Sequence, residues 1–138
     1  MSGAPLRDAD PAVAGLVDAE VARRATTVSL IASESVSTPG VRAALGSEFG
    51  DKYAEGHPGH RYHGGCEVVD ELEELAVARA RELFGAEYAD VQPVSGSVAN
   101  LAVYAAFAQP DDAVLALSLR HGGHQTHGSR ANFSGRWF

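Results

Sequence analysis

Residues 88–119 read YADVQPVSGSVANLAVYAAFAQPDDAVLALSL, and this stretch decides the fold. Residues 88–94 and 113–119 are short apolar runs, each of which predicts a buried strand. Residues 95–97, Ser-Gly-Ser, predict a turn, and the nearly all-apolar residues 98–108 predict a helix that stops before a proline. Strand, turn, helix and strand in this order indicate a parallel α/β unit with a right-handed crossover.

The preceding half of the chain is predicted to be helical around one long loop. An Asp-Pro pair followed by valines and a leucine at helical spacing predicts a helix over residues 10–24. A second proline predicts a brief helix over residues 39–46. The clearest amphipathic pattern predicts a helix over residues 67–84, with Gly85 at its C-terminal cap. Residues 50–66 hold five glycines and a proline, so we expect a loop without helix or strand.

Composition narrows the class of protein. The chain has 138 residues, a net charge of −7 and 45% apolar residues, which is typical of one soluble domain. The acidic balance argues against nucleic acid and against an anionic membrane surface as partners. Cys66 is the single cysteine, which favours a reducing compartment. No apolar run approaches the ~20 residues of a membrane span, and the N-terminus lacks the features of a signal peptide, so we expect a cytoplasmic location.

The turn at residues 95–97 is the first candidate for chemistry. A helix N-terminus offers unpaired N–H groups and a partial positive charge, serine hydroxyls add donors, and glycine lets a ligand approach the backbone. This arrangement suits a phosphate group. The alternative is that Ser97 is a plain N-cap of the helix.

Six histidines form two triplets with a spacing of three residues. The triplet after the second predicted strand could include a ring that stacks on a planar cofactor or acts as a general base, or simply surface histidines. Zinc is a further alternative, but the triplets lie in glycine-rich stretches without paired cysteines, so no metal site is predicted. The two triplets are His57, His60 and His63, and His121, His124 and His127.

Two further segments concentrate polar groups. The loop at residues 50–66 gathers phenols, imidazoles, a carboxylate and a guanidinium, more than a solvated loop needs. Residues 33–35, Ser-Glu-Ser, occupy a turn, where local capping is the simpler interpretation and a binding role the alternative.

Taken in order, these motifs resemble the serine hydroxymethyltransferase family over residues 28–138. The matching stretches are LIASES, DKYAEGHPGHRYHGGCEVVDELE, ARARELFGAEYADVQPVSGSVANLAVYAAFAQPDD and LRHGGHQTHGSRANFSG. The resemblance implies an α/β fold, a partial large domain of the pyridoxal-phosphate aminotransferase-like (fold type I) architecture with an N-terminal helical segment. The helical segment is expected over residues 1–27 and the partial cofactor-binding large domain over residues 28–138.

The resemblance also implies the site residues. Contacts with pyridoxal 5'-phosphate are expected from Ser95, Gly96 and Ser97 around the phosphate, Tyr53 from a neighbouring subunit, and His124 stacked on the ring. Contacts with substrates are expected from Ser33, Glu55 and Tyr62 for the amino acid, and from Leu119, Gly123 and Gln125 for folate. Catalytic roles are expected for Glu55, which handles the substrate hydroxyl proton, and for Tyr62, His63 and His124.

The implied reaction interconverts serine and glycine and transfers a one-carbon unit to tetrahydrofolate. The cofactor acts as the electron sink, and a carboxylate such as Glu55 moves the hydroxyl proton. The resemblance further implies a homodimer or a higher oligomer in the complete enzyme, with serine, glycine and tetrahydrofolate as its small-molecule partners.

Three residues depart from the family pattern. Ser35 stands where the family usually has Asn, His63 where it has a second Tyr, and Gln125 where it has Leu. The last two bear on substrate or folate handling, so a threonine-type aldolase or transaldolase is the alternative reaction. The family's Schiff-base lysine belongs to a later motif, and Lys52 is the only lysine of this sequence. We therefore expect the chain to be inactive alone, and a non-catalytic fragment that docks on a full-length homologue is the remaining alternative.

Overall fold

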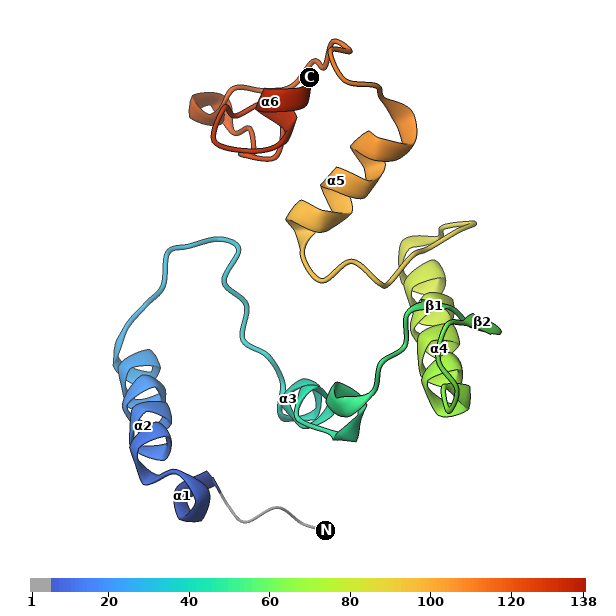
Figure 1. Ribbon diagram of the computed structural model, residues 1–138. Coiled ribbons are helices and arrows are strands. Elements are labelled where there is room, and N and C mark those ends of the chain that lie inside the picture. Colours follow the sequence, from blue (N-terminus) through green and yellow to red (C-terminus); the bar gives the residue numbers. More distant parts are fainter. Residues whose placement is uncertain (1–5) are drawn as a thin grey trace. The chain divides into compact units, whose positions relative to one another are not determined.

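The computed structural model describes residues 6–138, which form two compact units. The first unit ends at Asp51 and the second comprises Lys52–Phe138. Figure 1 shows helices joined by long extended connections.

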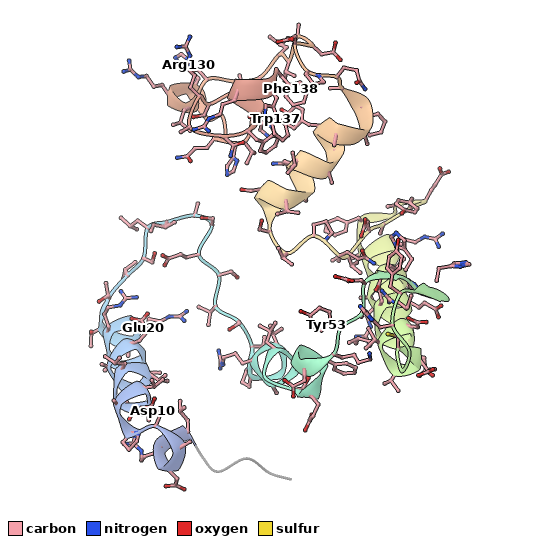
Figure 2. All side chains as sticks on the ribbon, in the orientation of Figure 1. Asp10, Glu20, Tyr53, Arg130, Trp137 and Phe138 are labelled. Atoms are coloured by element: carbon pink, nitrogen blue, oxygen red, sulfur yellow. The ribbon has the colours of Figure 1, made fainter. Side chains whose placement is uncertain are left out.

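The first unit is helical. It contains α1 (Leu6–Ala9), α2 (Pro11–Thr26), α3 (Pro39–Leu45) and the short 3-10 helix η1 (Glu48–Asp51). Asp10, labelled at the start of α2 in Figure 2, accepts a hydrogen bond from the backbone N–H of Val13 at 3.0 Å. Thr38 caps α3 in the same way. The two helices predicted for this region are confirmed. Their start signals could be read from the sequence because an N-cap involves only neighbouring residues, and both caps form.

The second unit contains one hairpin and four helical segments. Its elements are β1 (Gly56–His57), β2 (His60–Arg61), α4 (Glu67–Phe84), α5 (Gly96–Phe107), η2 (Leu119–His121) and α6 (Ser134–Trp137). The helix predicted over residues 67–84 is confirmed at both ends, and Gly85 follows it in the left-handed conformation, with φ of 60°. The expectation of no strand in residues 50–66 is wrong, because β1 and β2 pair as a two-residue antiparallel hairpin around Pro58 and Gly59.

The two strands predicted over residues 88–94 and 113–119 are also wrong for this structure. Among residues 6–138 the only ladder is that of β1 with β2, so the predicted parallel unit does not form. A strand needs a neighbour for its backbone N–H and C=O groups, and these two segments have none. Leu115 and Leu117 are accordingly exposed.

No residue of α4 is buried, and the side that is partly covered differs from the one that its apolar pattern indicates. Leu72, Leu75 and Leu83 lie on the predicted apolar face and are exposed, whereas Asp70 and Glu73 are partly covered. Ion pairs from Arg61 to these two carboxylates hold the hairpin against this side of α4. The apolar face is left without a partner among the described residues.

Very little apolar surface is buried in either unit. Within residues 6–138, Ala14 and Cys66 are the buried hydrophobic residues. No helix in this part of the chain is long and apolar enough to cross a membrane.

We predict that the 138-residue chain associates with itself and melts without a sharp transition. Exposed apolar side chains and unpaired extended segments gain free energy when a second chain covers them. Sedimentation at increasing concentration and scanning calorimetry measure both effects. Replacing Leu115 and Leu117 by Glu should reduce association, while Ser118→Glu adds charge without removing apolar surface and should reduce it less. A monomer with a sharp two-state melt would contradict this prediction.

Candidate functional site

Arg61 anchors the loop that carries four of the predicted site residues. Its side chain is only 5% exposed and contacts two carboxylates of α4. Nε lies 2.8 Å from Asp70 Oδ1, and Nη2 lies 2.6 Å from Glu73 Oε2. Nη1 donates to the carbonyl oxygens of Ala54 at 2.7 Å and Gly56 at 2.9 Å. One guanidinium therefore ties both arms of the hairpin to one helix.

The charges of Arg61, Asp70 and Glu73 stabilise one another. The backbone N–H of Gly59 donates to Asp70 and, together with the Arg61 guanidinium, holds the pKa of that carboxyl below its usual range. The hydrogen bonds that Arg61 donates to Glu73 and then to Asp70 raise the pKa of its guanidinium above the usual range. Gln92 adds an amide that donates to Glu73 Oε1 and to the carbonyl oxygen of Gly56, each at 2.8 Å. The loop is thus fixed by a charged network rather than by apolar packing.

The lowered pKa of Asp70 predicts that the hairpin loosens in acid. A carboxyl with a depressed folded-state pKa stabilises the folded state above its ordinary value of 3.8, and this contribution is lost as the pH falls through the depressed value. Amide hydrogen exchange of residues 54–61 should therefore accelerate at the acid end of the titration. Asp70→Asn should show fast exchange already at neutral pH. Equal protection in the variant and the parent across the titration would contradict the anchoring role.

The anchored loop brings Glu55 and His63 together. His63 Nε2 lies 3.3 Å from Glu55 Oε2, and the ring of Tyr53 meets the His63 ring edge-on with centroids 5.8 Å apart. Tyr53 and Tyr62 are exposed. Figure 2 labels Tyr53, which lies between η1 and β1. The loop therefore presents a carboxylate, an imidazole and two phenols on its outer side.

Lys52 closes the same loop. Its Nζ donates to the carbonyl oxygens of Tyr53 at 3.0 Å and Gly64 at 2.9 Å. An ammonium group engaged with two carbonyl oxygens holds the two ends of the loop together. These contacts give Lys52 a structural role in the loop.

The serine turn lies at the N-terminus of α5, but its two serines differ. Ser95 is the N-cap, because its hydroxyl accepts a hydrogen bond from the backbone N–H of Val98 at 3.2 Å. The alternative in which Ser97 caps the helix is therefore wrong, and the signal was ambiguous because both serines precede the apolar run. Ser97 lies in the first turn of α5, exposed, and its hydroxyl has no hydrogen-bond partner within residues 6–138. The helix start keeps unpaired N–H groups beside that hydroxyl.

A loop carrying His124 is tied to the same helix. Asn100 Nδ2 donates to Thr126 Oγ1 at 2.8 Å, and the hydroxyl of Tyr104 lies 2.9 Å from His127 Nδ1. Thr126 Oγ1 in turn lies 2.7 Å from His124 Nδ1. A cleft of about 560 Å³ opens beside this loop. Its lining includes Tyr104, Leu117, Gly122, Gly123, His124 and His127.

The residues expected to contact folate border this cleft or lie next to it. A Cβ on Gly123 would overlap the carbonyl oxygen of Leu117, so the chain needs glycine at this position. Leu119 is exposed and begins η2 rather than ending a strand. Gln125 is exposed between His124 and the buried Thr126.

Ser33 belongs to the first unit. It lies in a turn closed by a hydrogen bond from Glu34 N–H to the carbonyl oxygen of Ile31 at 3.0 Å. The turn is confirmed, but local capping by residues 33–35 is not seen, because Thr38 caps α3.

The histidine triplets are divided among different contacts. His57 lies 3.3 Å from Gln92 Nε2, and His121 lies 2.7 Å from the hydroxyl of Ser118. In the part of the chain that the structure describes, no three His, Cys, Asp or Glu side chains are grouped closely enough to hold a metal ion. The regular spacing in sequence therefore does not bring either triplet to one point.

Sequence reasoning missed the residues that organise these loops. Arg61 is the guanidinium of the polar loop, and its sequence position gives no sign of its partners on α4, which follow two glycines later in the chain. Asn100 carried a signal, since it is a polar side chain inside a nearly all-apolar helix. Thr126 carried none beyond its place between two histidines.

Comparison with known proteins identifies the family. The family model described as Serine hydroxymethyltransferase matches residues 6–138. A serine hydroxymethyltransferase of Prochlorococcus marinus (strain MIT 9303) is 56% identical over 98% of this chain, and one of Bifidobacterium adolescentis is 54% identical over 100%. Serine hydroxymethyltransferase 1 of Pseudomonas fluorescens (strain Pf0-1) is 56% identical over 96%. In each case the match spans 32% of the relative's own length.

The matched family is one of pyridoxal-phosphate-dependent proteins of fold type I. The chain belongs to this serine hydroxymethyltransferase family. The resemblance inferred from the ordered motifs is thereby confirmed, and the match extends further toward the N-terminus than residue 28.

Proposed function

We propose that this chain supplies the N-terminal part of a serine hydroxymethyltransferase that interconverts serine and glycine with tetrahydrofolate as the one-carbon acceptor. The observation that carries the proposal is the open N-terminus of α5. There the Ser95 hydroxyl caps the helix, the Ser97 hydroxyl has no hydrogen-bond partner within residues 6–138, and a histidine loop is tied to the same helix. Membership of the family supports the reaction.

The residues present fit the phosphate of pyridoxal 5'-phosphate. The first N–H groups of α5 point out of the helix, the helix dipole favours an anion, and the Ser97 hydroxyl adds a donor. Apart from its chain neighbours and the backbone of its own helix, no atom of the described residues lies within 4 Å of where a Cβ on Gly96 would stand, so this side of the backbone is open. When bound, the cofactor supplies an electron sink for the carbanion that forms at the substrate Cα.

The loop residues then handle protons and substrate. Glu55 is proposed to hold or remove the hydroxyl proton of serine, with His63 as its neighbour at 3.3 Å. The exposure of Tyr53, Glu55 and Tyr62 supports a role against another chain, as in a homodimer or higher oligomer. Ser33 is proposed to contact the substrate carboxylate. His124 is proposed to stack on the cofactor ring.

Leu119, Gly123 and Gln125 are proposed as the folate-contacting group. Residues 28–138 are proposed as part of the large domain, with a helical segment before them, in a cytoplasmic protein. The boundary proposed from sequence lies earlier than the division of the structure after Asp51.

A threonine-type aldolase is the second candidate. The observation that favours it is the Glu55–His63 contact, since the imidazole adds a proton-transfer group where the family usually has a phenol. Gln125 places an exposed amide where folate would meet an apolar side chain. Both functions use the same cofactor contacts and differ in the acceptor.

The two serines of the turn give a matched test of the cofactor site. The test uses a fusion protein, defined here as the Bifidobacterium adolescentis relative with its matched region replaced by this chain. Ser97→Ala should weaken pyridoxal-phosphate binding roughly tenfold or more, because a charge-assisted hydrogen bond contributes about 1.5–3 kcal/mol. Ser95→Ala should instead lower the stability of α5 by about 1 kcal/mol, the usual cost of a lost N-cap.

Cofactor titration followed by absorbance, and denaturant unfolding of the cofactor-free protein, separate the two effects. Weaker cofactor binding in Ser97→Ala, together with lower stability in Ser95→Ala, supports the proposal. If Ser97→Ala leaves cofactor affinity unchanged and reduces only stability, the phosphate assignment is contradicted.

A further inference from the structure

Thr126 is the most buried polar side chain of the described residues, at 1% exposure. It lies in a loop that is otherwise largely exposed, between His124 and His127. A buried hydroxyl requires hydrogen-bond partners, and Thr126 has one on α5 and one in its own loop. Thr126 is therefore buried where it links Asn100 of α5 to His124 of the loop.

The direction of each hydrogen bond follows from the donors. The backbone N–H of Thr126 lies 3.3 Å from His124 Nδ1, and an N–H group can only donate. Nδ1 is therefore the acceptor nitrogen of the ring. Since Asn100 Nδ2 donates to Thr126 Oγ1 at 2.8 Å, the hydroxyl proton is free to be donated to Nδ1, which lies 2.7 Å away. Two donors on Nδ1 leave the ring proton of the neutral imidazole on Nε2.

We propose that Thr126 is a positioning residue that fixes the orientation and the Nε2–H tautomer of His124, with Asn100 orienting its hydroxyl. The proposal deepens the proposed function, because it rests on His124 as the ring that meets the cofactor. A stacking ring must be held in one plane, and hydrogen bonds to one edge from two groups of Thr126 achieve this. An imidazole with a single hydrogen bond would rotate about its side-chain bonds more freely.

The anchor points lie on the face of α5 that also carries Ser97. Ser97, Asn100 and Tyr104 follow one another at helical spacing, so they share one side of the helix. Tyr104 holds His127 at 2.9 Å and stacks on Phe138, with ring centroids 5.2 Å apart. Trp137 and Phe138 are labelled at the end of the chain in Figure 2. Two contacts one turn apart therefore fix the histidine loop relative to the proposed phosphate-binding end.

The test compares Thr126→Val, which removes the hydroxyl at similar volume, with Thr126→Ser, which keeps it. Histidine labelled with nitrogen-15 reports the tautomer through the separate shifts of Nδ1 and Nε2, and His124→Gln assigns the signals. The measurement is made on the full 138-residue chain and on the fusion protein, both without cofactor. We expect a dominant Nε2–H tautomer in the parent and in Thr126→Ser, and a mixture of tautomers in Thr126→Val. An unchanged tautomer in Thr126→Val, or an equal mixture in both variants, would overturn the proposal.

Cofactor titration of the fusion protein forms the second arm. Thr126→Val should weaken pyridoxal-phosphate binding by roughly threefold to tenfold, the effect of one ordinary hydrogen bond, and Thr126→Ser should restore it. If the parent fusion protein binds no cofactor, the proposed function fails while the tautomer measurement still decides the role of Thr126. If cofactor binds and the tautomer does not depend on the hydroxyl, the positioning role fails and the proposed function stands.

Discussion

Replacing Glu55 by Gln in the fusion protein is expected to lower the turnover of serine roughly 10²-fold to 10⁴-fold, the range supplied by one general acid–base group. The amide keeps the shape of the side chain but cannot take up the hydroxyl proton. The lowered turnover should appear in kcat, with cofactor affinity unchanged, because Glu55 lies directly before β1 and the proposed phosphate site lies at the start of α5. Stopped assays of glycine formation measure the rate.

Glu71→Gln is the matched control, since Glu71 is an exposed carboxylate of α4 in the same unit. It should leave serine turnover at the level of the parent. Equal turnover in Glu55→Gln and Glu71→Gln would remove Glu55 from the reaction. A fall in the pH-independent rate confined to Glu55→Gln supports its proposed role.

Reverting the two departures from the family pattern is expected to strengthen the use of folate. Gln125→Leu removes an amide that has no hydrogen-bond partner within residues 6–138. Bound tetrahydrofolate would cover this exposed amide, and burying an amide without a partner costs about 1–3 kcal/mol, so tetrahydrofolate should bind roughly fivefold to 150-fold more tightly after the change. His63→Tyr removes the imidazole that contacts Glu55 and should reduce cleavage of threonine relative to serine.

Gln109→Leu provides the control for Gln125→Leu, because it makes the same exchange at another exposed position of this chain. Tetrahydrofolate binding and the ratio of threonine to serine cleavage are measured for each variant. If the reversions change neither quantity, His63 and Gln125 do not determine the acceptor.

The elements that could be predicted from the sequence are those whose signals are local. Asp10 caps the helix that follows it, and Gly85 ends α4 in the conformation that glycine favours. Each requires only contacts within a few residues of the chain. The family could also be inferred, because the ordered motifs depend on the sequence and not on the arrangement of the elements.

The predictions that were wrong concern features that depend on residues far away in the sequence. The apolar residues 88–94 and 113–119 have strand-like composition, but a ladder forms only where another segment supplies hydrogen bonds, and none of the described residues does so. The side of α4 that the hairpin covers is set by Arg61, which pairs with Asp70 and Glu73. Periodicity ranks faces by hydrophobicity and does not register an ion pair formed with a loop.

The candidate site shows the same difference between local signals and contacts with distant residues. The roles of Glu55, Ser97 and His124 are predictions from motifs and stay proposals, whereas the contacts around these residues required the structure. Ser95 and Ser97 are equally good caps by composition, and only the hydrogen bond to Val98 distinguishes them. The link from Asn100 through Thr126 to His124 joins residues 26 positions apart at its first step, beyond the reach of local patterns.

The most direct test of the central claim is the serine turnover of the unmodified fusion protein, measured with and without tetrahydrofolate. The claim is that this chain supplies working cofactor and proton-transfer contacts to a serine hydroxymethyltransferase. The account predicts bound pyridoxal phosphate and serine cleavage that tetrahydrofolate accelerates. A fusion protein that folds and assembles like its parent, yet binds no cofactor and cleaves neither serine nor threonine, would contradict it.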